Sequence, residues 1–124
     1  MGAFSVQFEI GDVSGGQWLR LEGLVDTGST YTWVPRDTLE ALSIQPQVTR
    51  EFETADGRVI SRELAVVQAR LDGETLPTLV VFADPGDSIL LGAVTLEEFG
   101  LGVDTVNRKL VPVRGLAMRR SALP

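Results

Sequence analysis

Apolar and polar residues alternate strictly from Phe4 to Ile10, which is the pattern of a β-strand with one buried face. Turn sequences then recur at short intervals, in the loop 12–16, at Asp56-Gly57 and at Asp72-Gly73. Short apolar segments separated by such turns are typical of consecutive antiparallel hairpins and not of βαβ units. We therefore expect an all-β fold in the form of a small closed barrel.

The same pattern predicts the individual elements. Strands are expected at 4–10, 18–25, 31–34, 48–53, 58–71, 76–82 and 89–91, followed by a closing hairpin of 101–105 and 110–113. Asp37 and Glu40 have the spacing of a capping box for a short helix through Leu42. The predicted fold class has one short helix near its C-terminus, from Ala93 to Phe99, with Gly100 as its C-terminal cap.

The composition excludes several kinds of chemistry. The chain has no Cys and no His, which removes thiolate and imidazole nucleophiles, Ser-His-Asp triads and ordinary zinc sites. Any acid or base chemistry must therefore use carboxylates, and we expect no metal and no cofactor. The absence of cysteine excludes disulfides and fits a reducing compartment, so we expect a cytoplasmic protein.

The length and the net charge of the chain limit the number of domains and the kinds of binding partner that we expect. The 124 residues fit one domain, which we place at residues 1–113, with a C-terminal tail at 114–124. The net charge of −6 argues against nucleic-acid binding, because phosphates would be repelled on average. No apolar stretch approaches the ~20 residues of a membrane-spanning helix, so we expect no membrane segment in this chain. The basic residues of the tail are given no function.

The most specific motif is Asp26-Thr27-Gly28-Ser29, which directly follows the apolar pair Leu24-Val25. Further along the chain stands a second apolar pair followed by glycine, Leu90-Leu91-Gly92. Between the two lies a hairpin with a small tip, Ala55-Asp56-Gly57-Arg58. In this order the motifs resemble aspartic proteases of the retroviral type, and the resemblance runs from the first strand to about Val113.

The resemblance implies a barrel of the retroviral aspartic protease type that acts as a homodimer on peptides or unfolded proteins. Asp26 would be the catalytic carboxylate, and each subunit would supply one. Two such carboxylates share a proton, because like charges at so short a distance cannot both ionise. One then serves as the base that activates water and the other as the acid, and the pair titrates as a unit.

The resemblance also implies roles for the residues around Asp26. Thr27 is expected to bond across to the other subunit's loop, Gly28 to allow a close backbone approach, and Ser29 to donate to Asp26. The expected substrate-binding residues of the flap and cleft are Thr30, Ala55, Asp56, Gly57, Arg58 and Val59. We expect Trp18 and Trp33 in the core or a dimer contact, and we leave Tyr31 open between core and substrate contact.

Two positions depart from the viral pattern. Retroviral enzymes often carry an acidic residue two places after the motif glycine and an arginine after the second glycine. This chain has Thr30 and Ala93 there. The missing ion pair favours a cellular or bacterial single-domain relative over a viral enzyme.

Other functions are compatible with parts of this pattern. Asp-Thr-Gly alone is an ordinary turn sequence, because Asp and Thr bond nearby backbone and Gly accepts positive φ. A catalytically silent dimeric module could keep the fold to hold peptides, or serve only for dimerisation. The intact Asp26-Thr27-Gly28, in its place after an apolar strand, favours the enzyme.

Overall fold

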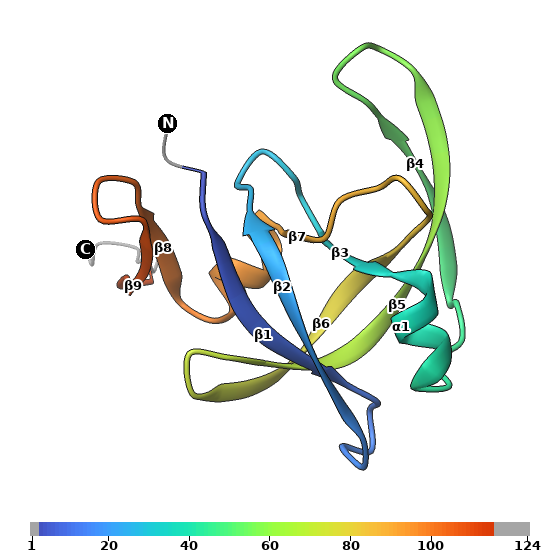
Figure 1. Cartoon of the computed structure of the whole chain (residues 1–124), viewed down its shortest axis with the longest axis horizontal. Helices are drawn as coiled ribbons and strands as arrows, with labels where there is room; N and C mark the ends of the chain where they lie inside the picture. Colours follow the sequence, from blue (N-terminus) through green and yellow to red (C-terminus); the bar gives the residue numbers. More distant parts are fainter. Residues whose placement is uncertain (1–2, 116–124) are drawn as a thin grey trace, which may run out of the picture.

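The structure is a computed structural model that describes residues 3–115, and it is built mainly of strands (Figure 1). The strands are β1 (Ser5–Gly11), β2 (Trp18–Val25), β3 (Thr32–Pro35), β4 (Val48–Glu53), β5 (Val59–Leu71), β6 (Glu74–Ala83), β7 (Leu90–Leu91), β8 (Leu101–Asp104) and β9 (Lys109–Pro112). The helices are α1 (Arg36–Ala41) and α2 (Ala93–Glu98). The all-β prediction is confirmed, and the strands begin and end within two residues of the predicted positions.

Seven strands form one sheet in the order β1-β2-β7-β3-β6-β5-β4, and β8 pairs with β9 in a separate hairpin. β1 also pairs with β5, through Glu9–Gly11 and Gln68–Arg70. The strand pairings therefore form a ring that starts and ends at β1. β4 remains outside this ring. The sheet is not wholly antiparallel as the hairpins suggested, because β2 pairs with β7, and β3 with β6, in parallel.

The core lies inside this curved sheet. On β1 the alternation predicted from sequence holds, since Phe8 and Ile10 are buried while Gln7 is exposed. Each helix adds a buried leucine to the same core, Leu39 from α1 and Leu96 from α2. Burial of these faces is the main stabilising contribution to the fold.

The two helices are short. α1 begins at Arg36 with Pro35 at its N-cap, and no side chain caps it. The predicted capping box is therefore wrong, because the helix starts one residue before Asp37 and places that residue inside the first turn. α2 ends as predicted, with Gly100 at φ +65° just after it. Within residues 3–115 no helix is long and apolar enough to cross a membrane.

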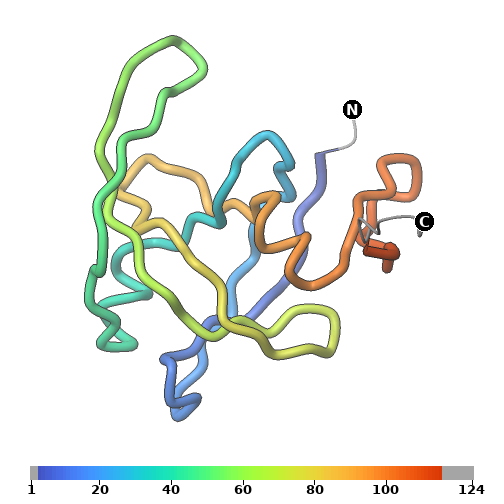
Figure 2. The backbone as a smooth tube through the Cα atoms, turned by 180° about the vertical axis from the view of Figure 1, so that it is seen from behind, coloured from blue at the N-terminus to red at the C-terminus, as the bar shows by residue number. Residues whose placement is uncertain are grey.

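The hairpin of β4 and β5 extends beyond the body of the protein, and we call it the flap (Figures 1 and 2). β5 is 13 residues long and has two partners in succession. From Val59 to Leu64 it pairs with β4, and from Leu64 to Leu71 it pairs with β6. The flap is therefore a two-stranded ribbon that continues directly from a core strand.

Ion pairs join the base of the flap to neighbouring loops. Arg62 of β5 contacts Asp87 through Nε (2.9 Å) and Nη2 (3.2 Å). Arg36 contacts Glu63 of β5 (2.8 Å) and Asp84 (3.1 Å). Because several charges meet here with bidentate geometry, the group contributes more than isolated surface pairs do. We call Arg36, Arg62, Glu63, Asp84 and Asp87 the basal ion cluster.

Candidate active site

Asp26 lies directly after β2, at the point where that strand's pairing with β7 ends. Its backbone N–H donates to the carbonyl oxygen of Leu91 (3.0 Å), and its carbonyl oxygen accepts from the N–H of Ser29 (3.1 Å). The carboxylate accepts from the N–H of Gly28 (2.9 Å). The turn is thus closed on itself and anchored to a buried strand, which fixes where the half-buried carboxylate stands.

The loop residues differ in how they match their predicted roles. A Cβ on Gly28 would lie 3.2 Å from Oδ1 of Asp26, so glycine permits the close approach of backbone to carboxylate. Ser29 does not donate to Asp26 as predicted; its Oγ donates to the carbonyl oxygen of Tyr31 (2.8 Å). The bond expected from Thr27 involves a second subunit and stays a prediction.

Gly92 and the start of α2 pack against the Asp26 loop and bond to its backbone. The N–H groups of Ala93 and Val94 donate to the carbonyl oxygens of Ser29 (2.8 Å) and Thr30 (2.9 Å). A Cβ on Gly92 would lie 2.3 Å from the carbonyl oxygen of Tyr31, so only glycine fits without a shift. At the two positions that depart from the viral pattern, Thr30 and Ala93, backbone bonds connect the loop to α2.

Buried threonine hydroxyl groups form a hydrogen-bonded network that begins at the N–H of Gly92, and the sequence analysis did not predict it. Thr32 Oγ1 accepts from the N–H of Gly92 (3.0 Å) and donates to Thr95 Oγ1 (2.7 Å). Thr95 Oγ1 lies 2.9 Å from Thr78 Oγ1, which donates to the Glu98 carboxylate (2.7 Å). Each hydroxyl has one proton, so Thr95 must donate to Thr78. We call Thr32, Thr78 and Thr95 the hydroxyl network.

A cleft of about 790 Å³ separates the Asp26 loop from the first strand of the flap. Its lining residues are Asp26, Gly28, Ser29, Thr30, Tyr31, Trp33, Arg50, Glu51, Phe52, Glu53, Thr54, Ala55 and Leu90. Two of the predicted substrate-binding residues, Thr30 and Ala55, therefore line it. The aromatic residues form one wall, since Phe52 packs edge-on against Tyr31 (6.2 Å between centroids) and Trp33 (5.2 Å).

The other predicted flap residues, Asp56, Gly57, Arg58 and Val59, do not line the cleft. The turn folds them away, because Thr54 bonds to Arg58 and Gly57 across the tip and the Arg58 side chain turns to Asp56 (3.1 Å). The hydrogen bond from Thr54 lowers the pKa of Asp56. Gly57 has φ +86°, as expected of a tip glycine.

The sequence pointed to the flap but not to the strand of it that faces Asp26. Tyr31 and Trp33 lie two residues apart just after the Asp26 motif, and Phe52 lies on the flap, so the aromatic side chains themselves were the available signal. Trp33 was expected in the core or in a dimer contact; it is partly buried and lines the cleft.

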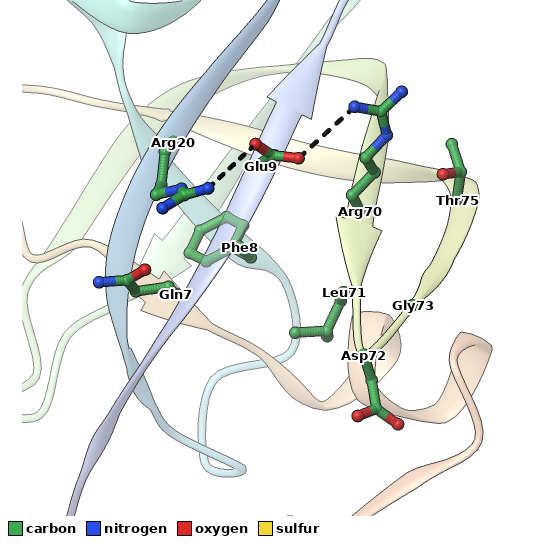
Figure 3. Close-up of a pocket in the computed structure, with 9 residues that line it drawn as sticks. All are labelled: Gln7, Phe8, Glu9, Arg20, Arg70, Leu71, Asp72, Gly73 and Thr75. Carbon is green, nitrogen blue, oxygen red and sulfur yellow. Dashed lines mark ion pairs between the residues drawn. The ribbon is translucent and has the colours of Figure 1, made fainter.

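A second hollow, of about 400 Å³, lies at the pairing of β1 with β2 and β5 (Figure 3). Glu9 stands there between two arginines, Arg20 (3.8 Å) and Arg70 (3.5 Å), as Figure 3 shows. Arg70 also lies 3.8 Å from the centre of the Trp18 ring. Because both guanidinium groups share one internal carboxylate and no residue of the Asp26 loop lines the hollow, the cleft is the better candidate for an active site.

Comparisons with known proteins agree with this geometry. The solution structure of simian foamy virus (mac) protease matches with a TM-score of 0.55 and 23% identity, over 77% of this chain and 94% of that one. This likeness concerns the fold. A search of curated proteins gave no match. The family model described as aspartyl protease matches residues 6–95, which include the Asp26 loop, the flap and Gly92. The match covers well over half of the chain, and the chain, whose fold is like that of the foamy virus protease, therefore belongs to the aspartyl protease family of peptide hydrolases.

Proposed function

We propose that the active enzyme is a homodimeric endopeptidase in which Asp26 and the partner subunit's Asp26 activate one water molecule. The observation that carries this proposal is that the chain has a single Asp-Thr-Gly, and its carboxylate lines a cleft beneath the flap. An amide hydrolysis that proceeds without a covalent intermediate needs one carboxylate as base and a second as acid. A two-fold axis between two copies would supply both.

The nearest lookalike in the chain cannot supply the second carboxylate. Asp104 lies at the end of β8 and accepts hydrogen bonds from the N–H groups of Val106 (3.1 Å) and Asn107 (3.0 Å). These bonds, with that from the Asn107 side chain, lower its pKa. Asp104 thus caps the β8–β9 turn, which supports a dyad whose second carboxylate comes from another chain.

The surface next to Asp26 suits a second copy. A further hollow of about 310 Å³ reaches Asp26 and Thr27 from the side of the β8–β9 hairpin, and Phe4, Val25 and Val103 help to line it. Apolar residues beside a catalytic carboxylate are expected where a partner subunit packs.

The proposed reaction requires no other group. The ionised carboxylate takes a proton from water as the water oxygen attacks the peptide carbon, while the protonated one gives its proton to the carbonyl oxygen. The carboxyl that took the water proton then gives it to the peptide nitrogen, a hydroxyl of the tetrahedral intermediate returns its proton to the other carboxylate, and the C–N bond breaks. The products are a carboxylic acid and an amine, and the dyad again holds one proton. An extended peptide fits such a cleft, because the outer edge of β4 has no strand partner in residues 3–115 and can add one.

The test is cleavage of an unfolded polypeptide by the purified chain and by Asp26→Asn, from acidic to neutral pH. We expect the variant to fold and dimerise but to lose at least ten-fold in kcat/KM, since the amide cannot act as base. Excess Asp26→Asn chain should also silence the wild type by forming mixed dimers.

Three results would contradict parts of the proposal. Peptide binding by the wild type without cleavage would favour the silent module. Residual activity of Asp26→Asn within tenfold of wild type would remove Asp26 from the mechanism. A monomer in sedimentation, at concentrations where specific activity is full and constant, would exclude the dimer.

A further inference from the structure

The guanidinium group of Arg50, on β4, lies against Tyr31 in the aromatic wall of the cleft. Its Nη1 donates to the hydroxyl oxygen of Tyr31 (2.6 Å), and its guanidinium carbon lies 5.7 Å from the centre of the Tyr31 ring. Both residues line the same cleft as Asp26. The phenol orients the cation but does not neutralise it, and it uses only one of the five N–H groups of the guanidinium.

The other arginines of the flap differ from Arg50 in this respect. Arg58 is paired with Asp56 (3.1 Å) and Arg62 with Asp87 (2.9 Å). Arg50 has no carboxylate within 4.0 Å anywhere in residues 3–115. In the register of β4 and β5, moreover, Arg50 stands directly opposite Arg62. Like charges opposite one another are unfavourable, and only Arg62 is compensated.

The direction of the side chains decides which charges face the cleft. Arg50 and Phe52 both contact Tyr31, so they lie on the same face of β4, as expected for residues two apart. Glu51 and Glu53 alternate with them along β4, and the period of a strand assigns their side chains to the opposite face. Their carboxylates therefore do not cancel the charge of Arg50 on the cleft side, although these residues border the cleft.

We infer that Arg50 makes the enzyme select substrates that carry a carboxylate side chain two residues away from an apolar one. The apolar side chain would pack on Phe52 and Trp33, and the carboxylate would take the free N–H groups of Arg50. The spacing follows from a substrate strand beside β4, in which side chains two residues apart share a face at about 6.8 Å. This inference rests on the proposed peptidase function and names its substrate class.

The test uses short peptides of one sequence that differ at a single position, Glu, Gln or Lys, two residues before or after a leucine. Wild type should show a kcat/KM for the best Glu peptide about fivefold above that for its Gln counterpart, the upper range for a solvent-exposed ion pair. Arg50→Gln should abolish this ratio, and Arg50→Lys should keep part of it, since it retains the charge without the fork. Arg20→Gln removes the same charge at a residue that lines the other hollow and not the cleft, so it should leave the ratio as in wild type.

A binding measurement separates failure of this inference from failure of the peptidase proposal. The fluorescein-labelled peptides are titrated by anisotropy with Asp26→Asn, alone and combined with Arg50→Gln. The Glu peptide should bind about fivefold tighter only where Arg50 is present. Three results would overturn the inference, whether or not any peptide is cut. They are equal binding of the Glu and Gln peptides, tighter binding of the Lys peptide, and a preference for the Glu peptide that survives Arg50→Gln. Binding with the expected preference but no cleavage by wild type would support it and reject the peptidase.

Discussion

Replacing Gly92 by alanine should destabilise the protein and displace the Asp26 loop. The backbone at Gly92 has φ −95° and ψ 174°, which any residue adopts, so the substitution costs nothing in conformation. The added methyl group, however, would lie 2.3 Å from the carbonyl oxygen of Tyr31, 2.4 Å from its carbonyl carbon and 2.9 Å from the oxygen of Ser29. All three are backbone atoms, which cannot rotate away as a side chain would.

The size of the effect follows from these contacts. To reach ordinary van der Waals separation the loop must move by roughly 1 Å. Overpacking of this kind costs about 1–3 kcal/mol. The bonds from Gly92 to Thr32 and from Ala93 to Ser29 would lengthen too, at about 1 kcal/mol each. We expect a loss of about 3–5 kcal/mol in the free energy of unfolding, and a loss of about 100-fold in kcat/KM because Asp26 moves with the loop.

Urea unfolding at one fixed protomer concentration measures the first quantity, since the stability of the proposed dimer would depend on concentration. The second is measured at a temperature where the variant is folded. Gly16→Ala is the control, because its nearest neighbour is the Ser14 hydroxyl at 3.6 Å, and its effect should stay within about 0.5 kcal/mol. A loss below about 1 kcal/mol with unchanged kcat/KM would show that Gly92 does not determine where the loop sits.

Two further variants test other parts of the structure. Thr95→Val removes the middle group of the hydroxyl network and leaves the buried hydroxyl donor of Thr32 unpaired. It should lower the free energy of unfolding, measured in urea, by about 1–3 kcal/mol. The exposed Thr49→Val is the control and should cost about 0.5 kcal/mol or less, and equal losses for the two variants would argue against the network. Burial tends to raise the pKa of Asp87, but hydrogen bonds from Arg62 and from backbone, with the arginine charge, outweigh it and lower that pKa. The resulting stability is present above the unfolded pKa of about 3.9 and is lost as the pH falls through the lower folded value. Asp87→Asn should therefore be less stable than wild type at neutral pH and lose less stability on acidification, and parallel urea midpoints between about pH 7 and pH 2 would contradict this.

The strands could be predicted closely because the signals for them are local. Alternation marks β1, and the tip glycine at 57 and the turn at Asp72-Gly73 set the ends of β5. The parallel pairs could not be predicted in the same way. β2 meets β7, and β3 meets β6, across long stretches of chain, and no short-range pattern records which distant strands will be neighbours.

At the site, the sequence identified the motif but not all of its partners. Asp26, Gly28 and Gly92 lie together as the motif order implied. Ser29 bonds instead to Tyr31, because a serine hydroxyl readily takes a carbonyl two residues away, and several acceptors are equivalent in sequence terms. Arg50 was overlooked for a different reason: which face of a hairpin turns toward a cleft depends on the twist of the strands in three dimensions.

The continuity of β5 determines where the flap can bend. Leu64 is fully buried and has a strand partner on each side, Val48 and Val81, so it behaves as part of the rigid body. Beyond it only two strands remain, and such a ribbon is far more compliant than a sheet. Any bending of the flap relative to the body is therefore expected just outside Leu64, at Arg62 and Glu63, which belong to the basal ion cluster. The ion pairs that stabilise the base of the flap should therefore also determine how stiffly the flap bends.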